Sequence, residues 1–479
     1  MLNYRNFALR RLAALGPRYL PFADVASEDV PLSQLLRLSL FQVSVGMALV
    51  LLVGTLNRVM IVELEVPATL VAVMLALPLL FAPFRTLIGH KSDTHVSALG
   101  LRRVPYIWKG TLYQFGGFAI MPFALLVLSG YGEAVDAPRW IGYSSAALAF
   151  LLVGAGVHIV QTVGLALATD LVEEEDQPKV VGLMYVMLLL GMVVAALVYG
   201  ALLENYSPGR LIQVIQGSAV ATVALNLIAM WKQEARSRER ARQMEAARPV
   251  AFSSAWSHLM QQPYMLRLLV LIALGTFGFG MADVLLEPYG GQVLGLSVAD
   301  TTKLTALLAT GTLIGFGIAS RVLGSGGSPE RMAAVGAAVG VPGFAAIILA
   351  SLGGGKSTFL AGTLATGLGA GLFGHATLTA TIRAAPRERI GLSLGAWGAV
   401  QATSAGIGVA LAGIVRDVIV GLHGSTGSTP HMAYNVVFMI EALVLVLAIA
   451  VALPLALKAR RTGAGYRPEA TNTKTVEVS

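Results

Sequence analysis

The chain has 479 residues, of which 56% are hydrophobic and only 13% are charged. Soluble globular proteins carry about 25% charged residues, so this composition argues against a soluble enzyme, a nucleic-acid-binding protein and a disordered scaffold. The sequence contains no cysteine, which excludes disulfides, thiolate metal sites and cysteine nucleophiles. The formal net charge of +8 therefore raises the question of which side of a membrane carries the positive residues.

Twelve apolar segments are each long enough to cross a bilayer core of about 30 Å, which requires about 20 helical residues. Strands of a membrane barrel would be about half as long and would alternate in polarity. The sequence therefore predicts an all-α integral membrane protein with twelve transmembrane helices. The predicted spans are 38–62, 68–88, 104–128, 141–171, 180–203, 211–231, 266–286, 302–322, 332–352, 359–382, 390–420 and 433–457.

Lysine and arginine residues are distributed unequally between the two sides of this topology. Of the 34, 28 fall on the side of the N-terminus and 6 on the opposite side. Because positive residues accumulate on the cytoplasmic side of membrane proteins, both termini are expected to be cytoplasmic. The first span is too long for a signal-peptide hydrophobic region of about 7–15 residues, so it is expected to serve as its own targeting signal.

A polar gap divides the twelve spans into two groups of six. The fourth span contains Gly-Ala-Gly from Gly154 followed by His158, and the tenth contains Gly-Ala-Gly from Gly369 followed by His375. Two matched six-helix halves resemble the fold of the major facilitator superfamily. The predicted parts are a cytoplasmic N-terminal segment with a possible interfacial helix (1–37), the first half (38–231), a cytoplasmic linker (232–265), the second half (266–457) and a cytoplasmic tail (458–479).

Two of the seven histidines, His158 and His375, lie within predicted spans. An ionisable residue inside a membrane is a functional candidate, and neutral imidazole is a common axial ligand for the metal of a macrocycle. Gln161 lies one helical turn after His158 and is expected to share its surroundings. The alternative is that each histidine only forms a hydrogen bond to a neighbouring helix. No metal site made by the protein alone is expected.

Four charged residues lie toward the outer ends of the first and seventh spans, Arg58 and Glu63 in one and Asp283 and Glu287 in the other. One interpretation is an interhelical charge network that closes the outer side, and the other is snorkelling to the interface. Carboxylates in mid-helix are few, with Glu441 the clearest, which argues against a proton-coupled pump of polar solutes. No catalytic constellation is visible, so the chain is not expected to be an enzyme.

Several stretches closely resemble the PucC/LhaA family, a bacteriochlorophyll-delivery branch of the major facilitator superfamily in purple phototrophic bacteria. Residues 84–95 read FRTLIGHKSDTH, residues 102–108 read RRVPYIW, and residues 283–291 read DVLLEPYGG. The resemblance covers nearly the whole chain and is especially specific from 84 to 130. Its cytoplasmic loop motif contains Gly89, Asp93, Arg102 and Arg103.

The resemblance implies an assembly factor for light-harvesting antennas in the bacterial inner (intracytoplasmic) membrane, carrying bacteriochlorophyll a as a transient pigment. One branch of the family, LhaA, serves the core antenna around the reaction centre, and the other serves the peripheral antenna. The length and the N-terminal extension favour the core branch. The alternatives are a peripheral-antenna factor and a secondary transporter of an apolar or amphipathic solute.

The partners implied are the antenna α and β polypeptides and the assembly intermediates of the reaction centre with its antenna. Bacteriochlorophyll synthase and the membrane insertion machinery are further expected partners. A pigment carrier needs an apolar groove, an axial ligand for magnesium such as His158 or His375, and a face that docks a helix. Small residues in the spans suit such docking, because they allow backbones to approach closely.

Overall fold

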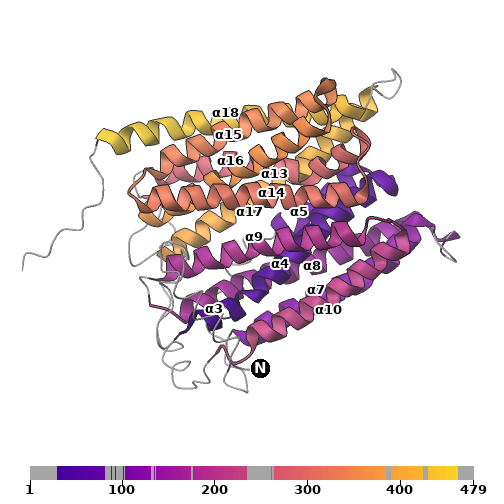
Figure 1. Ribbon diagram of the computed structural model, residues 1–479, viewed down its shortest axis with the longest axis horizontal. Helices are drawn as coiled ribbons and strands as arrows, with labels where there is room; N and C mark the ends of the chain where they lie inside the picture. Colours follow the sequence, from indigo (N-terminus) through magenta and orange to yellow (C-terminus); the bar gives the residue numbers. More distant parts are fainter. Residues whose placement is uncertain are drawn as a thin grey trace, which may run out of the picture.

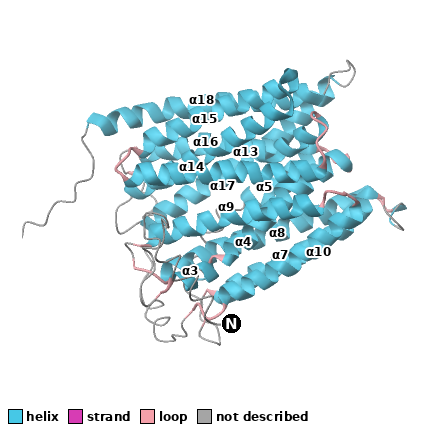
Figure 2. Ribbon diagram, viewed as in Figure 1, coloured by secondary structure: helices cyan, strands magenta, loops and turns pink. Residues whose placement is uncertain are grey.

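The computed structural model describes residues 30–80, 103–130, 136–173, 176–234, 264–384, 390–423 and 430–461, with a few isolated residues between these ranges. Within these ranges all regular secondary structure is helical (Figure 2). The helices run side by side as one bundle, with the helices of the first half on one side and those of the second half on the other (Figure 1). The remaining parts of the N-terminal segment, the linker and the tail lie outside the described residues.

The first half follows the predicted order of spans. Its elements are α3 (Leu32–Leu38), α4 (Leu40–Leu49), the π-helical turns η2 (Val50–Leu56) and η3 (Val59–Glu63), α5 (Ala68–Leu80), α7 (Val104–Ser129), α8 (Arg139–Asp170), α9 (Gln177–Leu202) and α10 (Pro208–Met230). The first four form one span, in which the wide π-helical turns occupy the outer end. Such turns occur frequently at functional sites.

The second half repeats this order with longer helices. Its elements are α13 (Met265–Gln292), α14 (Val298–Gly324), α15 (Pro329–Leu349), the π-helical turn η5 (Ala350–Gly354), α16 (Gly355–Ala384), α17 (Ile390–His423) and α18 (Pro430–Arg461). The described residues agree with the twelve predicted spans to within a few residues at most ends.

The number of crossings is compatible with twelve. Among the described residues, ten helices have the length and composition to cross a membrane, and Ala68–Leu79 is a shorter apolar helix. One of the ten, Pro329–Ala384, contains both α15 and α16. These two helices pack against each other because the chain reverses at Gly353 and Gly355, whose φ angles are +119° and +66°. Positive φ of this kind favours glycine.

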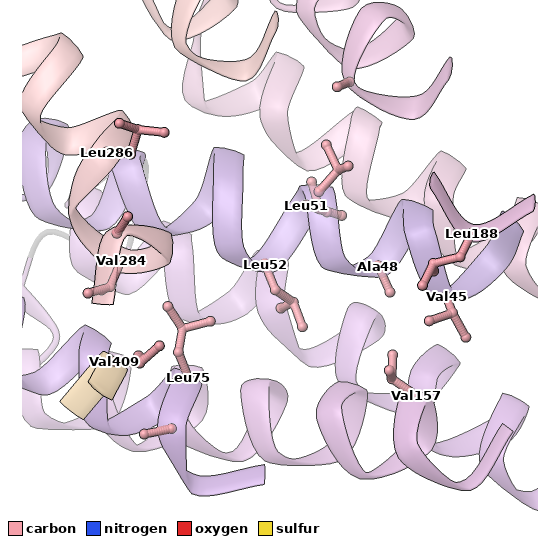
Figure 3. Packing of buried hydrophobic residues seen from close by; sticks show 14 of the residues in the cluster. Val45, Ala48, Leu51, Leu52, Leu75, Val157, Leu188, Val284, Leu286 and Val409 are labelled. Carbon is pink, nitrogen blue, oxygen red and sulfur yellow. The ribbon is translucent and has the colours of Figure 1, made fainter. Parts of the chain in front are cut away.

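The first span contacts both halves of the protein. Figure 3 shows its buried residues from Val45 to Leu52 between Val157 of α8, Leu188 of α9 and Val284 of α13, and all of them belong to one apolar cluster. The halves also meet along α5 with α17 and along α9 with α14 (Figure 1). The boundary between the halves is therefore formed by six spans. The first span, α5 and α9 contribute to it from the first half, and α13, α14 and α17 from the second.

Helices α14 and α16 approach each other closely through two pairs of glycines. Gly311 and Gly315 on α14 face Gly367 and Gly371 on α16, each pair four residues apart. A Cβ atom at Gly371 would lie 2.1 Å from the carbonyl oxygen of Thr312, and one at Gly315 would lie 2.3 Å from a backbone oxygen of α16. This is the small-residue spacing by which membrane helices bring their backbones into contact.

We expect Gly371→Leu to destabilise the second half, because overpacking a tight contact costs about 1–3 kcal/mol. The matched control is Gly317→Leu on α14, where an added Cβ meets nothing within 4 Å. Thermal unfolding of both variants in mild detergent measures the difference. Equal Tm values for the two variants would contradict the close packing of α14 on α16.

Candidate functional site

A cavity of about 840 Å³ lies between the two halves. Its volume falls in the upper part of the range of about 300–1,000 Å³ that is typical of small-molecule sites. Helices α4, α5, α8 and α9 line it from the first half, and α13, α14, α16 and α17 from the second. The lining reaches Thr169 on α8, Leu378 on α16 and Gly395 on α17, so the cavity extends toward the side that the charge distribution assigns to the cytoplasm.

The cavity wall is mainly apolar and contains a few polar groups. Phe279 and Phe373, whose ring centroids are 6.0 Å apart, form part of the wall from the second half. Trp397 of α17 also lines the cavity and donates its indole N–H to the hydroxyl of Thr377 at 3.3 Å. Apolar walls with a small number of polar groups are typical of sites that bind and orient organic ligands.

His158 and Gln161 both line the cavity from α8. Residues three apart share one face of a helix, and the structure places this face toward the second half. Asp283 of α13 lines the same cavity. An imidazole, an amide and a carboxyl group therefore line one cavity, whereas the role of His158 and Gln161 in pigment binding stays a prediction.

His375 is not among the residues that line the cavity, although its neighbours Phe373 and Gly374 are. Its ring lies against Phe316 of α14, with the centroids 4.2 Å apart. Its Nδ1 atom is buried and has no hydrogen-bond partner in the described part of the chain. The two histidines occupy equivalent helices, but the structure does not bring them together in one site.

Arg58 joins the outer end of the first span to the second half. Its guanidinium forms an ion pair with Glu63 and donates to the carbonyl oxygen of Leu296 at 3.1 Å. The side chain of Arg58 is only 4% exposed, and a Cβ atom at Gly291 would lie 2.8 Å from its Nη2. Burial and then the nearby Glu63 carboxylate raise the pKa of Tyr206, in the connection after α9, to about 12.

Further contacts hold the first span to α13 and α14. The Asn57 amide donates to the carbonyl oxygen of Val284 at 2.9 Å. The carboxylate of Glu287 accepts a hydrogen bond from Thr305 and lies so close to the first span that a Cβ at Gly54 would be 2.7 Å from its Oε1. Three of the four predicted outer charges thus lie in one region, and the fourth, Asp283, faces the cavity instead.

A second set of outer contacts was not predicted from the sequence. The carboxylate of Asp417 on α17 accepts the backbone N–H of Thr69, in the first turn of α5, at 2.7 Å. Arg416 pairs with Asp417 at 2.7 Å and donates to Gln292 at 2.9 Å, and Tyr434 donates to the same Gln292 oxygen at 2.6 Å. An anion at a helix N-terminus is stabilising. In the sequence, this second set of contacts is indicated only by the adjacent charges of Arg416 and Asp417 near the end of an apolar segment.

Arg103 of the predicted cytoplasmic loop motif lies among elements of the first half. Its Nε donates to Asp170 at 3.0 Å and its Nη1 to Ser92 at 2.7 Å. The carboxylate of Glu234 accepts the backbone N–H groups of Arg103 and Val104 at 3.0 Å, which satisfies donors at the start of α7. The other residues of this motif lie outside the described residues: Gly89, Asp93 and Arg102.

We expect Arg58→Ala and Glu63→Ala to be coupled in their effect on the free energy of unfolding, because the two side chains form one ion pair. Since Glu63 is 37% exposed, a coupling of about 0.5–1 kcal/mol is expected. Arg58→Ala and Asp283→Ala should add within about 0.5 kcal/mol. Unfolding in mild detergent measures both cycles, and coupling in the second cycle alone would contradict the assigned contacts.

Comparison with solved structures identifies the fold. A bacterial homolog of the human lysosomal transporter Spinster, in an inward-facing and unoccupied conformation, superimposes with a TM-score of 0.65 at 15% identity and covers 91% of this chain and 98% of that chain. A point mutant of the nucleoside transporter NupG gives a TM-score of 0.66 at 13% identity, and the match covers 88% of this chain and 99% of that chain. The predicted facilitator-type fold is confirmed.

Comparison with known sequences identifies the family. Protein PucC of Rhodobacter capsulatus is 74% identical over 93% of this chain and 97% of its own length, and protein PucC of Rhodovulum sulfidophilum is 65% identical over 88% and 92%. An uncharacterized protein of the puhA-bchM intergenic region of Rhodobacter capsulatus is 50% identical over 90% and 91%. The family model described as PUCC protein matches residues 55–460. The chain therefore belongs to the PUCC protein family, as its sequence motifs predict.

Proposed function

We propose that the chain is a membrane assembly factor for a bacterial light-harvesting antenna, and that it holds bacteriochlorophyll a in the cavity between its halves before delivery to antenna apoproteins. The observation that carries this proposal is the mainly apolar cavity of about 840 Å³ with His158 in its wall. Membership of the PUCC protein family supports it independently.

The chemistry of the pigment fits this cavity. Bacteriochlorophyll is apolar, and its magnesium takes an axial ligand, for which a neutral imidazole is suited. In this proposal His158 supplies that ligand, Gln161 offers its amide to a polar substituent of the ring, and Phe279 and Phe373 contact the apolar face. Magnesium then enters the site only as part of the pigment. Enclosure between two helical halves also separates the photoreactive pigment from water.

The partners that follow from this proposal are the antenna α and β polypeptides, which are single-span helices, and the assembly intermediates around the reaction centre. Bacteriochlorophyll synthase and the insertion machinery are the proposed suppliers of pigment and apoprotein. The location that follows is the bacterial inner membrane with both termini in the cytoplasm. The unequal distribution of lysine and arginine supports this orientation.

The identities favour the peripheral antenna as the client. The two relatives named PucC are 74% and 65% identical, whereas the protein of the puhA-bchM intergenic region is 50% identical. The length and N-terminal extension, which favoured the core branch, are weaker signals than identity over the whole chain. Deletion of the gene in its phototrophic host should reduce the near-infrared absorption of the peripheral antenna and retain that of the core. The reverse would assign the chain to the core antenna.

A second candidate function is secondary transport of an apolar or amphipathic solute. The observation in its favour is that the cavity extends to one side while polar contacts join the halves at the other, as expected of a transporter in one of two access states. Uptake of labelled amphipathic solutes into liposomes tests this function. Flux together with a colourless purified protein would favour it over pigment delivery.

We expect His158→Leu to weaken bacteriochlorophyll binding about tenfold or more, since a lost contact of about 1.4 kcal/mol raises Kd tenfold, and so to lower the pigment content of the purified protein. The matched control is His375→Leu, which removes an intramembrane imidazole that does not line the cavity. Pigment-to-protein ratios from the near-infrared spectrum measure both. Equal loss in the two variants, or loss in neither, would contradict His158 as the ligand.

A further inference from the structure

Two carboxyl groups belong to the packed helices α13 and α18, where the cavity meets the interior of the second half. Asp283 of α13 lines the cavity. Glu441 of α18 is fully buried behind it, and neither of its carboxyl oxygens has a hydrogen-bond partner within the described residues. Pigment binding as proposed involves neither carboxyl group, although a carboxyl group inside a membrane is costly.

Helix α13 packs closely on α18 at the turn of α18 that carries Glu441. Gly278 of α13 allows this approach, since a Cβ atom there would lie 2.9 Å from Leu445 and 3.5 Å from the carbonyl oxygen of Glu441. The charge of Asp283 acts on Glu441. An ionised form of either residue therefore raises the cost of ionising the other.

No lysine or arginine is paired with either carboxyl group within the described part of the chain, and the titratable group that faces Asp283 across the cavity is the imidazole of His158. On α13, Glu287 is itself acidic and is bonded to Thr305. On α17, Arg416 is paired with Asp417 and bonded to Gln292. The other ionisable residues of α13, α15, α16 and α17 either lie near helix ends or, for His375, pack against Phe316: Arg267, Glu330, Arg331, Lys356, His375, Arg383 and His423.

A carboxyl group in an apolar cavity wall and a buried one behind the wall, both without a paired cation, are stabilised by protons or by a bound metal ion. A metal ion needs several oxygen ligands, whereas neither oxygen of Glu441 has a hydrogen-bond partner in the described residues. A proton needs no such shell, and a protonated carboxyl group is uncharged. The surroundings of Glu441 therefore favour a proton over a metal ion.

We propose that Asp283 and Glu441 form a proton-binding site in which the buried Glu441 keeps its own proton, and that a second proton, on Asp283, keeps the cavity wall uncharged while an apolar ligand is bound. Occupancy of the cavity is then coupled to proton uptake, since ionisation of Asp283 would place a charge against an apolar ligand. The proton released on ionisation passes to water in the cavity. The identity of the ligand rests on the proposed function, whereas the proton site does not.

The first test needs no pigment. Infrared titration of the purified full-length protein should show a C=O band of protonated carboxyl groups at pH 7. Asp283→Asn should remove the part of this band that is lost as the pH rises, and Glu441→Gln should remove the part that remains. The control variant Asp300→Asn removes an exposed carboxyl group that lies 3.6 Å from Lys356, and it should keep the band. Absence of the band in the wild type, or its dependence on sodium in place of protons, would overturn the proposal.

The second test measures binding of bacteriochlorophyll a between pH 6 and pH 9. Above the midpoint of the titration, the affinity of the wild type should fall about tenfold per pH unit, as expected for one coupled proton. Asp283→Asn should bind independently of pH, and Asp300→Asn should follow the wild type. A pH-independent wild type would overturn the coupling. If the pigment binds at no pH, the proposed function fails, while the infrared titration still decides the proton site.

Discussion

Inside a bilayer a polar group without a partner is costly, because no water is present to replace the missing bond. At the outer end of this protein, polar groups of one half find their partners in the other half. Arg58 donates to the carbonyl of Leu296, Asn57 to that of Val284, and Asp417 accepts the N–H of Thr69. Separating the halves at this end would leave these groups unpaired, so the contacts define where the protein is closed.

Because the halves are joined at the outer end, the cavity extends toward the opposite end of the bundle. The lining residues lie from the middle of the bundle toward the ends of α8 and α16 and the start of α17, the side that is expected to be cytoplasmic from the lysine and arginine distribution. Under the proposed function, a ligand would enter the cavity from the side on which pigment synthesis and apoprotein insertion are expected to supply it. A fold shared with transporters is thereby suited to delivery, since fold alone does not determine function.

The fold was largely predictable from the sequence, because each span must be about 20 apolar residues long and must satisfy its own backbone. The grouping of His158 with Gln161 was predictable too, since their spacing fixes one helical face. The direction of that face was not predictable, because rotation of a helix about its axis depends on its neighbours. His375 illustrates this: it lies beside Phe316, whereas the adjacent Gly374 lines the cavity. The adjacent charges of Arg416 and Asp417 indicated a polar site at this end of α17, but the pairing of Asp417 with Thr69 was not predictable, because it joins residues 348 positions apart.

The most direct test of the account is an experimental structure of the full chain purified with its pigment from a phototrophic host. The account predicts density for a tetrapyrrole ring in the cavity between the halves, with the magnesium bound by the imidazole of His158. A pigment bound on the lipid-facing surface, with the cavity free of it, would contradict the central claim.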